Sequence, residues 1–132
     1  MQEIMPQDIE VRYILPAIRR ELALILIKDH NLSQKETSRL LGLTEAAISQ
    51  YKNSKRAKEV IFNEAVLQEI KESSKRIIQD QKNKQRVMSE MIRISNLTKV
   101  KHILCEIHRS QSKNLKDCNV CFEEDLIQVK TQ

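Results

Sequence analysis

The sequence predicts an all-α protein, and two features of its composition and one of its pattern lead to this prediction. The 132 residues include one Gly and two Pro, so the residues that turns between strands need are scarce. Aromatic residues, which strands favour, make up only 3%. Apolar residues instead recur at steps of three and four, the spacing of one helix face. A chain of this length holds one average domain, or a small module with an extension.

The apolar pattern places the helices along the chain. A first helix carries Ile14, Ile18, Leu22 and Ile25 and ends near residues 29–31. A capping box of Ser33 and Glu36 starts a short helix through residue 41, and a third runs from residue 45 to about 53. Further helical spacing covers 59–80 and 87–109. Residues 79–86 contain no apolar residue and predict a loop or an exposed turn.

Charge and motif content narrow the classes of function. The net charge of +5 is compatible with a nucleic-acid partner. No run of about 18 apolar residues occurs and the N-terminus lacks an apolar signal core, so we expect a cytoplasmic protein without membrane contact. No P-loop, glycine-rich nucleotide motif or catalytic triad is recognisable. We therefore expect no enzyme and no small-molecule substrate.

Residues 33–52, SQKETSRLLGLTEAAISQYK, carry the pattern of a helix-turn-helix. Such a motif needs a small residue inside its first helix, here Ser38, and a sharp turn four positions later, here at Gly42. Leu41 and Leu43 flank the turn, and Ile48 anchors the second helix. The remaining face of that helix can enter a major groove about 12 Å wide; it consists of Thr44, Glu45, Ala46, Ser49 and Gln50. The alternative is a helical hairpin buried in a bundle core.

Cations without an acid follow the second helix. They are Lys52, Lys55, Arg56 and Lys58. Beside a helix in the major groove, such side chains hold the phosphate backbone. The alternative is a solvated helix end, where the dipole favours cations.

The segment LSQKETSRLLGLTEAAISQYKNSKR resembles the helix-turn-helix of the XRE class, which is related to phage repressors. With the preceding VRYILPAIRRELALILI, it is similar to a family of archaeal predicted transcriptional regulators over about residues 6–58. The resemblance implies a bundle of four or five helices that binds DNA as a dimer. It also implies that Gln34 contacts phosphate, that Thr44, Glu45, Ala46, Ser49 and Gln50 face bases, and that Lys52, Lys55 and Arg56 hold the backbone. Ala57 departs from the family, where a glycine is expected.

The C-terminal part contains every cysteine of the chain. Cys105 and His108 form one pair at i, i+3 spacing, and Cys118 and Cys121 form another. Three thiols and one imidazole complete a tetrahedral set, which predicts a metal centre. The alternative is that the pairs arise by chance and that Cys105 is a small buried apolar residue.

The identity of the centre stays open between zinc and an iron–sulfur cluster. Zinc suits Cys₃His and would stabilise a short C-terminus. A cluster accepts the same ligands. The resemblance implies an LC-x-x-HR then C-x-x-C pattern, which is similar to residues 104–109 and 118–121. Relatives often carry a further C-x-x-C upstream, and residues 92–95 have none.

Together these patterns predict three regions. Residues 1–58 form a repressor-like helix-turn-helix bundle, 59–100 a helical dimerisation region, and 101–132 a Cys/His-rich extension that binds the metal or cluster. We expect a homodimer on a palindromic operator, paired through Leu67, Ile70 and Ile77 with part of 87–104, and a regulator that senses through its centre. The alternatives are a helical adaptor resembling an antitoxin, with structural zinc, and a small metal or electron carrier.

Overall fold

The computed structural model describes residues 4–53, 56–57, 60–111 and 118, and within them it is helical with no strand. The elements are α1 (Pro6–Ile9), the π-helical segment η1 (Glu10–Ile14), α2 (Leu15–Lys28), α3 (Gln34–Leu41), α4 (Glu45–Lys52), α5 (Glu64–Gln79), α6 (Arg86–Ser95) and α7 (Thr98–Gln111). The all-α prediction is confirmed for this part of the chain. None of these helices is both long and apolar enough to cross a membrane.

The first helix begins earlier than the apolar spacing predicts. Pro6 is its first residue, where a missing N–H costs no hydrogen bond, and the Asp8 carboxylate accepts from the Met5 N–H at 3.0 Å. Ile9 is buried within this added stretch. A proline at the first position and an acid two residues later were therefore the sequence signals for this helix start.

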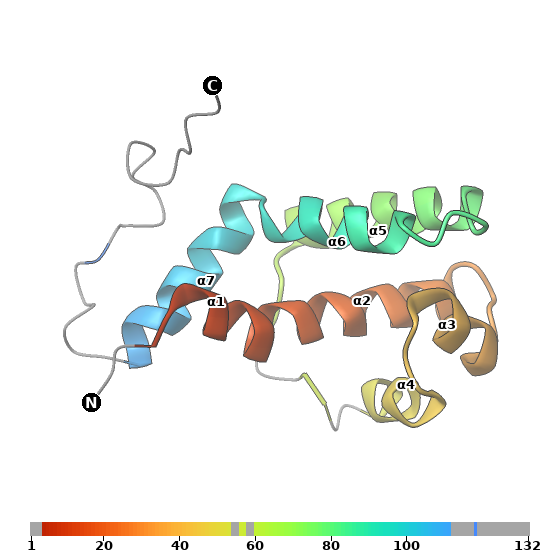
Figure 1. Ribbon diagram of the computed structural model, residues 1–132, viewed down its shortest axis with the longest axis horizontal. Helices are drawn as coiled ribbons and strands as arrows, with labels where there is room; N and C mark the ends of the chain where they lie inside the picture. Colours follow the sequence, from red (N-terminus) through yellow and green to blue (C-terminus); the bar gives the residue numbers. More distant parts are fainter. Residues whose placement is uncertain (1–3, 54–55, 58–59, 112–117, 119–132) are drawn as a thin grey trace.

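The helices are arranged around α2 (Figure 1). The segments α1, η1 and α2 follow one another along the length of the molecule, and the α5–α6 hairpin lies along one side of them. On the other side, α3 and α4 pack against α2. Helix α7 crosses beside α1, at the end of the molecule away from α3. Residues 80–85 join α5 to α6, as the polar stretch 79–86 predicts.

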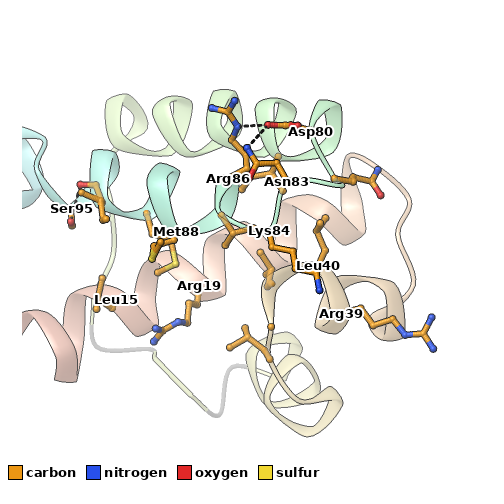
Figure 2. Close-up of a pocket in the computed structure, with 18 of the residues that line it drawn as sticks. Leu15, Arg19, Arg39, Leu40, Asp80, Asn83, Lys84, Arg86, Met88 and Ser95 are labelled. Atoms are coloured by element: carbon orange, nitrogen blue, oxygen red, sulfur yellow. Dashed lines mark hydrogen bonds and ion pairs between the residues drawn. The ribbon is translucent and has the colours of Figure 1, made fainter.

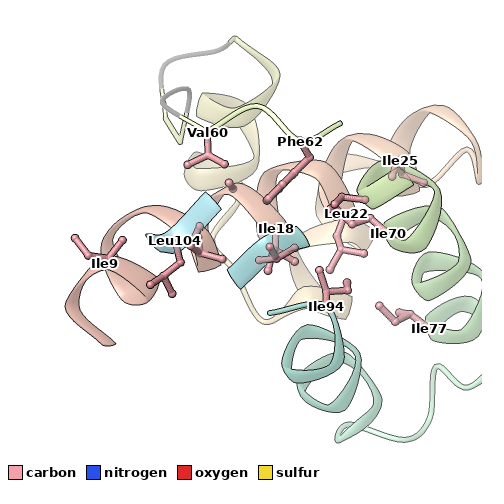
Figure 3. Close-up of a cluster of buried hydrophobic side chains, with 14 residues drawn as sticks. Ile9, Ile18, Leu22, Ile25, Val60, Phe62, Ile70, Ile77, Ile94 and Leu104 are labelled. Carbon is pink, nitrogen blue, oxygen red and sulfur yellow. The ribbon is translucent and has the colours of Figure 1, made fainter. Parts of the chain in front are cut away.

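The main core lies between α1–α2 and the helices α5, α6 and α7 (Figure 3). Ile18 and Leu22 of α2 have no exposed surface, and Ile94 of α6 packs beside them. The full buried set is Ile9, Ile14, Ala17, Ile18, Leu22, Ile25, Val60, Phe62, Val66, Ile70, Ile77, Ile94, Val100 and Leu104. This core therefore draws side chains from all three regions that the sequence predicts.

The prediction that Ile70 and Ile77 pair with a second copy of the chain is wrong. Ile70 is 0% exposed and Ile77 is 1% exposed within a single chain, and Leu67 packs partly buried against the same core. The apolar face of α5 meets α2 and α6 and so is not available to a second copy. The helical spacing of this face was correct, but spacing does not say which element covers it.

A second, smaller cluster joins α2 to α4. It consists of Ala23, Ala47, Ile48 and Tyr51, all at most 5% exposed. Leu41 and Leu43, on either side of the turn after α3, pack against it partly buried. Helix α2 thus contributes to two cores on opposite sides.

The connection from α4 to α5 is held by one arginine of α2. Arg20 is 9% exposed; it donates from Nη2 to the Val60 carbonyl at 2.8 Å and from Nη1 to the Ala57 carbonyl. The Glu21 carboxylate forms an ion pair with the Arg20 guanidinium at 2.9 Å. Ala57 adopts a left-handed conformation with φ 59°, which explains why a glycine is expected at this position.

A buried carboxylate fastens α5 to α6. Ser73 donates to the Glu90 carboxylate at 2.8 Å, Arg76 at 3.0 Å, and Arg93 at 3.3 Å. Burial alone would raise the pKa of Glu90, but the hydrogen bonds from Arg76, Ser73 and Arg93 outweigh it and lower the pKa to about 2. The hydrogen bond to Glu90 is also the main reason why the pKa of Arg76 is raised.

We predict that Ala57→Gly stabilises the protein. A left-handed backbone costs alanine about 1–2 kcal/mol, and glycine removes this strain. Part of the gain is offset because glycine gives the unfolded chain more conformational freedom. The free energy of unfolding, measured by urea denaturation, should rise by about 0.5–1 kcal/mol. The matched control is Ala65→Gly, at an exposed residue with helical backbone in the first turn of α5; it should lower the free energy of unfolding by at most about 0.5–1 kcal/mol, the cost of a glycine in a helix interior. A loss of stability in Ala57→Gly would contradict the left-handed turn.

A second prediction concerns acid stability. Because the folded pKa of Glu90, about 2, lies below its ordinary value of 4.5, the contribution of Glu90 is complete above pH 4.5 and is lost as the pH falls towards 2. Glu90→Gln should lower the free energy of unfolding at pH 7 by about 1.5–3 kcal/mol, the usual contribution of a hydrogen bond to a charged group. It should also flatten the pH dependence between pH 4.5 and 2, measured by chemical denaturation across that range. Glu106→Gln, on the exposed side of α7, is the control and should change neither.

Candidate nucleic-acid interface and cysteine cluster

The two short helices α3 and α4 begin at side-chain caps. The Ser33 hydroxyl accepts from the Glu36 N–H at 3.0 Å, and the Thr44 hydroxyl accepts from the Ala47 N–H at 3.0 Å. Each cap satisfies one of the N–H groups that a helix start leaves without a partner. Both cap positions agree with the sequence prediction, and Gln34 is the first residue of α3.

A left-handed glycine makes the turn between them. Gly42 has φ 67°, and the Leu43 N–H donates to the Ser38 carbonyl at 2.9 Å. This conformation strains any residue with a β-carbon. Ser38 is 6% exposed, and its hydroxyl donates back to the Lys35 carbonyl at 2.8 Å, so it occupies little space where the helices meet.

Helix α4 has an apolar inner face and a polar outer face. Ala47, Ile48 and Tyr51 are buried against α2 and the turn. Of the residues predicted to face bases, Thr44, Glu45 and Ala46 are exposed, while Ser49 and Gln50 are half-buried. Lys52 is exposed at the end of the helix. The packing therefore leaves the outer face of α4 open.

Arginines from a distant segment line a hollow beside α4. Arg12 of η1 and Arg19 of α2 border it together with Arg56, and Tyr51 forms part of its wall. The hollow measures ≈ 490 Å³. None of these arginines forms an ion pair with another described residue; Arg12 and Arg56 are exposed, and Arg19 is half-buried.

The sequence prediction of phosphate contacts included Arg56 but missed Arg12 and Arg19. Their seven-residue separation, two helical turns, was the only available signal that they share a helix face. The packing of α4 on α2 places that face beside Arg56. Lys55 and Lys58, the other predicted cations, lie outside the described residues.

Two of the predicted metal ligands lie on the buried side of α7. Cys105 and His108 are each 6% exposed, and the His108 Nε2 is hydrogen-bonded to the Ile4 carbonyl before α1. Cys118 lies beyond α7, where its carbonyl accepts from Arg109 at 2.8 Å. Cys121 lies outside the described residues. The prediction of a four-ligand centre therefore concerns a site that is described only in part.

The donor chemistry on α7 suits a metal, but the described residues do not assemble a full set. When the proton of His108 is on Nε2, that atom donates to the Ile4 carbonyl and leaves Nδ1 as the ring donor for a metal, which is a common arrangement in metal sites. Within the described part of the chain, however, no three His, Cys, Asp or Glu side chains are close enough to hold one ion. A centre would need the Cys118 thiol to approach α7 together with Cys121.

The structure describes most of the predicted DNA-contact residues but only three of the four predicted metal ligands. The outer face of α4 is open, and the hollow bordered by Arg12, Arg19 and Arg56 meets the same helix at Tyr51. Cys105 and His108 form a pair on α7, and Cys118 lies beyond that helix. No family model, curated protein or solved structure matches this chain, so the resemblance to archaeal regulators rests on the residues of the sequence alone.

Proposed function

We propose that this protein binds duplex DNA through α4 and regulates transcription. The observation that carries the proposal is the open polar face of α4 beside a hollow bordered by Arg12, Arg19 and Arg56. A polar helix face reads base edges, and unpaired arginines next to it bind phosphate. A buried helical hairpin would not need either feature.

The side chains on α4 suit base recognition. Gln50 can donate to and accept from an adenine, and the Glu45 carboxylate can accept from the cytosine amino group. Helix α4 has eight residues and so is about 12 Å long, enough to contact a few base pairs. Gln34, at the start of α3, fits a phosphate contact that fixes the docking angle.

A single short helix reads too little sequence for a specific operator, so we propose that two copies bind together. Paired recognition helices contact half-sites about 34 Å apart on one side of the duplex. The interface must use a surface other than Ile70 and Ile77, which the main core buries. A homodimer of this kind predicts a palindromic operator.

We further propose that Cys105, His108, Cys118 and Cys121 hold zinc or an iron–sulfur cluster. Cys105 and His108 share the buried side of α7, and His108 is tied to the N-terminal segment through Ile4. A ligand set that joins α7 to the residues beyond it would fix the C-terminal part relative to α1. Loss of the centre would then alter the packing at that end of the bundle, which makes a sensing role possible.

The DNA proposal predicts an effect of the arginines that border the hollow. Arg12→Ala with Arg56→Ala should weaken binding to all duplexes similarly and reduce the slope of log affinity against log salt by about 2. Fluorescence anisotropy at several salt concentrations measures both quantities. Lys71→Ala with Lys99→Ala, exposed on α5 and α7, is the matched control and should leave the slope unchanged. An unchanged slope in the arginine variant, with intact helicity by circular dichroism, would refute the docking.

The metal proposal predicts a bound ion or cluster in anaerobically purified protein. Elemental analysis and the absorption spectrum distinguish zinc from iron and sulfide. Cys118→Ser should lose the metal, whereas Ser110→Ala, on the exposed side of α7, should retain it. If the centre senses, its removal should change operator affinity by about 5–150-fold without loss of the helical fold. Protein free of zinc and iron would contradict the site, and equal affinities would leave it purely structural.

A further inference from the structure

A cleft of ≈ 700 Å³ lies between α2, the C-terminal half of α3 and α6 (Figure 2). Its volume is within the range of about 300–1,000 Å³ that is usual for small-molecule sites. The turn at Gly42 forms one part of the wall, and the loop between α5 and α6 forms another. Neither the predicted DNA contacts nor the predicted metal ligands explain this cleft.

The floor of the cleft is apolar and partly open to solvent. Met88 is 59% exposed and Ile92 is 55% exposed, one helical turn apart on α6. Leu15 of α2, Leu40 of α3 and Met91 of α6 also line the cleft. Leu15 and Leu40 lie on its α2–α3 side and Met88 on its α6 side (Figure 2). Unbranched methionines adapt to chains of varied shape. The floor therefore suits a flexible apolar chain better than a rigid polar ligand.

One cation extends over the cleft. Lys84 points towards Leu40, whereas the side chains of Arg39 and Arg19 start in the wall of the cleft and point away from it (Figure 2). None of these three cations has an ion-pair partner among the residues that the structure describes.

The acids of the cleft do not balance this charge. Asp80 is already occupied, because it accepts from Arg86 at 3.0 Å and from Asn83 at 3.1 Å. Glu10 is the one further carboxylate in the wall of the cleft. The ammonium group of Lys84 is therefore the uncompensated positive charge that lies over the apolar floor.

We infer that this cleft binds an amphiphile with one apolar chain and an anionic headgroup. The chain lies along Met88, Ile92 and Leu40, and the carboxylate or phosphate of the headgroup pairs with Lys84. A second copy of the protein is a poorer occupant. In a two-fold interface each cleft would face its own equivalent, and the two Lys84 ammonium groups would repel one another.

Binding at this position would connect α6 to the turn that precedes α4. Arg39 and Gly42 belong to the wall of the cleft, and Thr44, two residues later, caps α4. An occupied cleft would favour one orientation of α4 over others, so the ligand would change DNA affinity. This regulatory consequence rests on the proposed function, whereas the binding itself does not.

Isothermal titration calorimetry of the full chain with dodecanoate, below its micelle concentration, tests the inference. We expect one dodecanoate per chain, comparable binding of dodecyl phosphate, and at least tenfold weaker binding of dodecyltrimethylammonium, which has the same chain and the opposite charge. Equal binding of the anionic and cationic amphiphiles would overturn the charge argument. No binding of either anion to protein that remains helical would overturn the site.

Variants with matched controls locate the ligand. Met88→Ser with Ile92→Ser should weaken dodecanoate binding about tenfold, and Lys84→Gln should weaken it several-fold. Val11→Ser, at an apolar residue that is 64% exposed on η1, and Lys82→Gln, in the same loop as Lys84 but not in the cleft wall, should leave the affinity unchanged. Unaltered binding in the cleft variants would refute the location. A dimer in sedimentation that Met88→Ser converts to monomer would instead identify this face as a self-association surface and overturn the proposal.

The two proposals fail separately. Dodecanoate binding without any affinity for duplex DNA would refute the proposed function and leave the cleft ligand in place. DNA binding with a slope that depends on Arg12 and Arg56, but without dodecanoate binding, would refute the cleft ligand alone.

Discussion

The burial of α2 on two opposite sides is the constraint on which the rest of the molecule depends. Ile18 and Leu22 face α5 and α6, while Ala23 faces Ile48 and Tyr51 of α4. Each fully buried aliphatic side chain contributes about 1.5–3 kcal/mol, so this helix joins two cores that neither side could form alone. Any displacement of α2 would therefore move α4 relative to α5 and α6.

The same helix also sets the charge beside α4. Arg20 points into the protein and holds the carbonyls of Ala57 and Val60, which fixes where the chain passes after α4. Arg19, the adjacent residue, borders the hollow with Arg56. Neighbouring arginines on one helix thus have different roles: one fastens the connection, and the other remains available to an anion.

Three sides of helix α6 have different surroundings. Glu90 and Arg93 face α5 through a polar network, and Ile94 enters the main core. Met88 and Ile92 lie on a third side, where they form part of the floor of the cleft. Because a buried carboxylate with several donors requires defined geometry, this network fixes the rotation of α6. The apolar stripe of the cleft is therefore held in place by polar contacts on the opposite side of the helix.

Local chemistry explains why the sequence predicts so much of this protein. Caps at Ser33 and Thr44, the glycine turn at Gly42 and the polar loop after α5 each depend on neighbouring residues, and each is confirmed. The outer face of α4 follows from the same helical spacing that places Ile48 inside. The expectation of a glycine at position 57 also reflects a local property, the left-handed backbone that Ala57 adopts.

Only the tertiary structure shows which apolar helix faces pack against one another. Spacing marked Ile70 and Ile77 as buried, but only packing showed that α2 covers them and not a second copy. Packing likewise placed Arg12 and Arg19 beside Arg56 and opened the cleft over Met88. These contacts join segments far apart in the chain, and helical periodicity contains no information about the partner of a face. The sequence therefore determined the helices and their ends, whereas long-range packing determined the surfaces on which the proposed function depends.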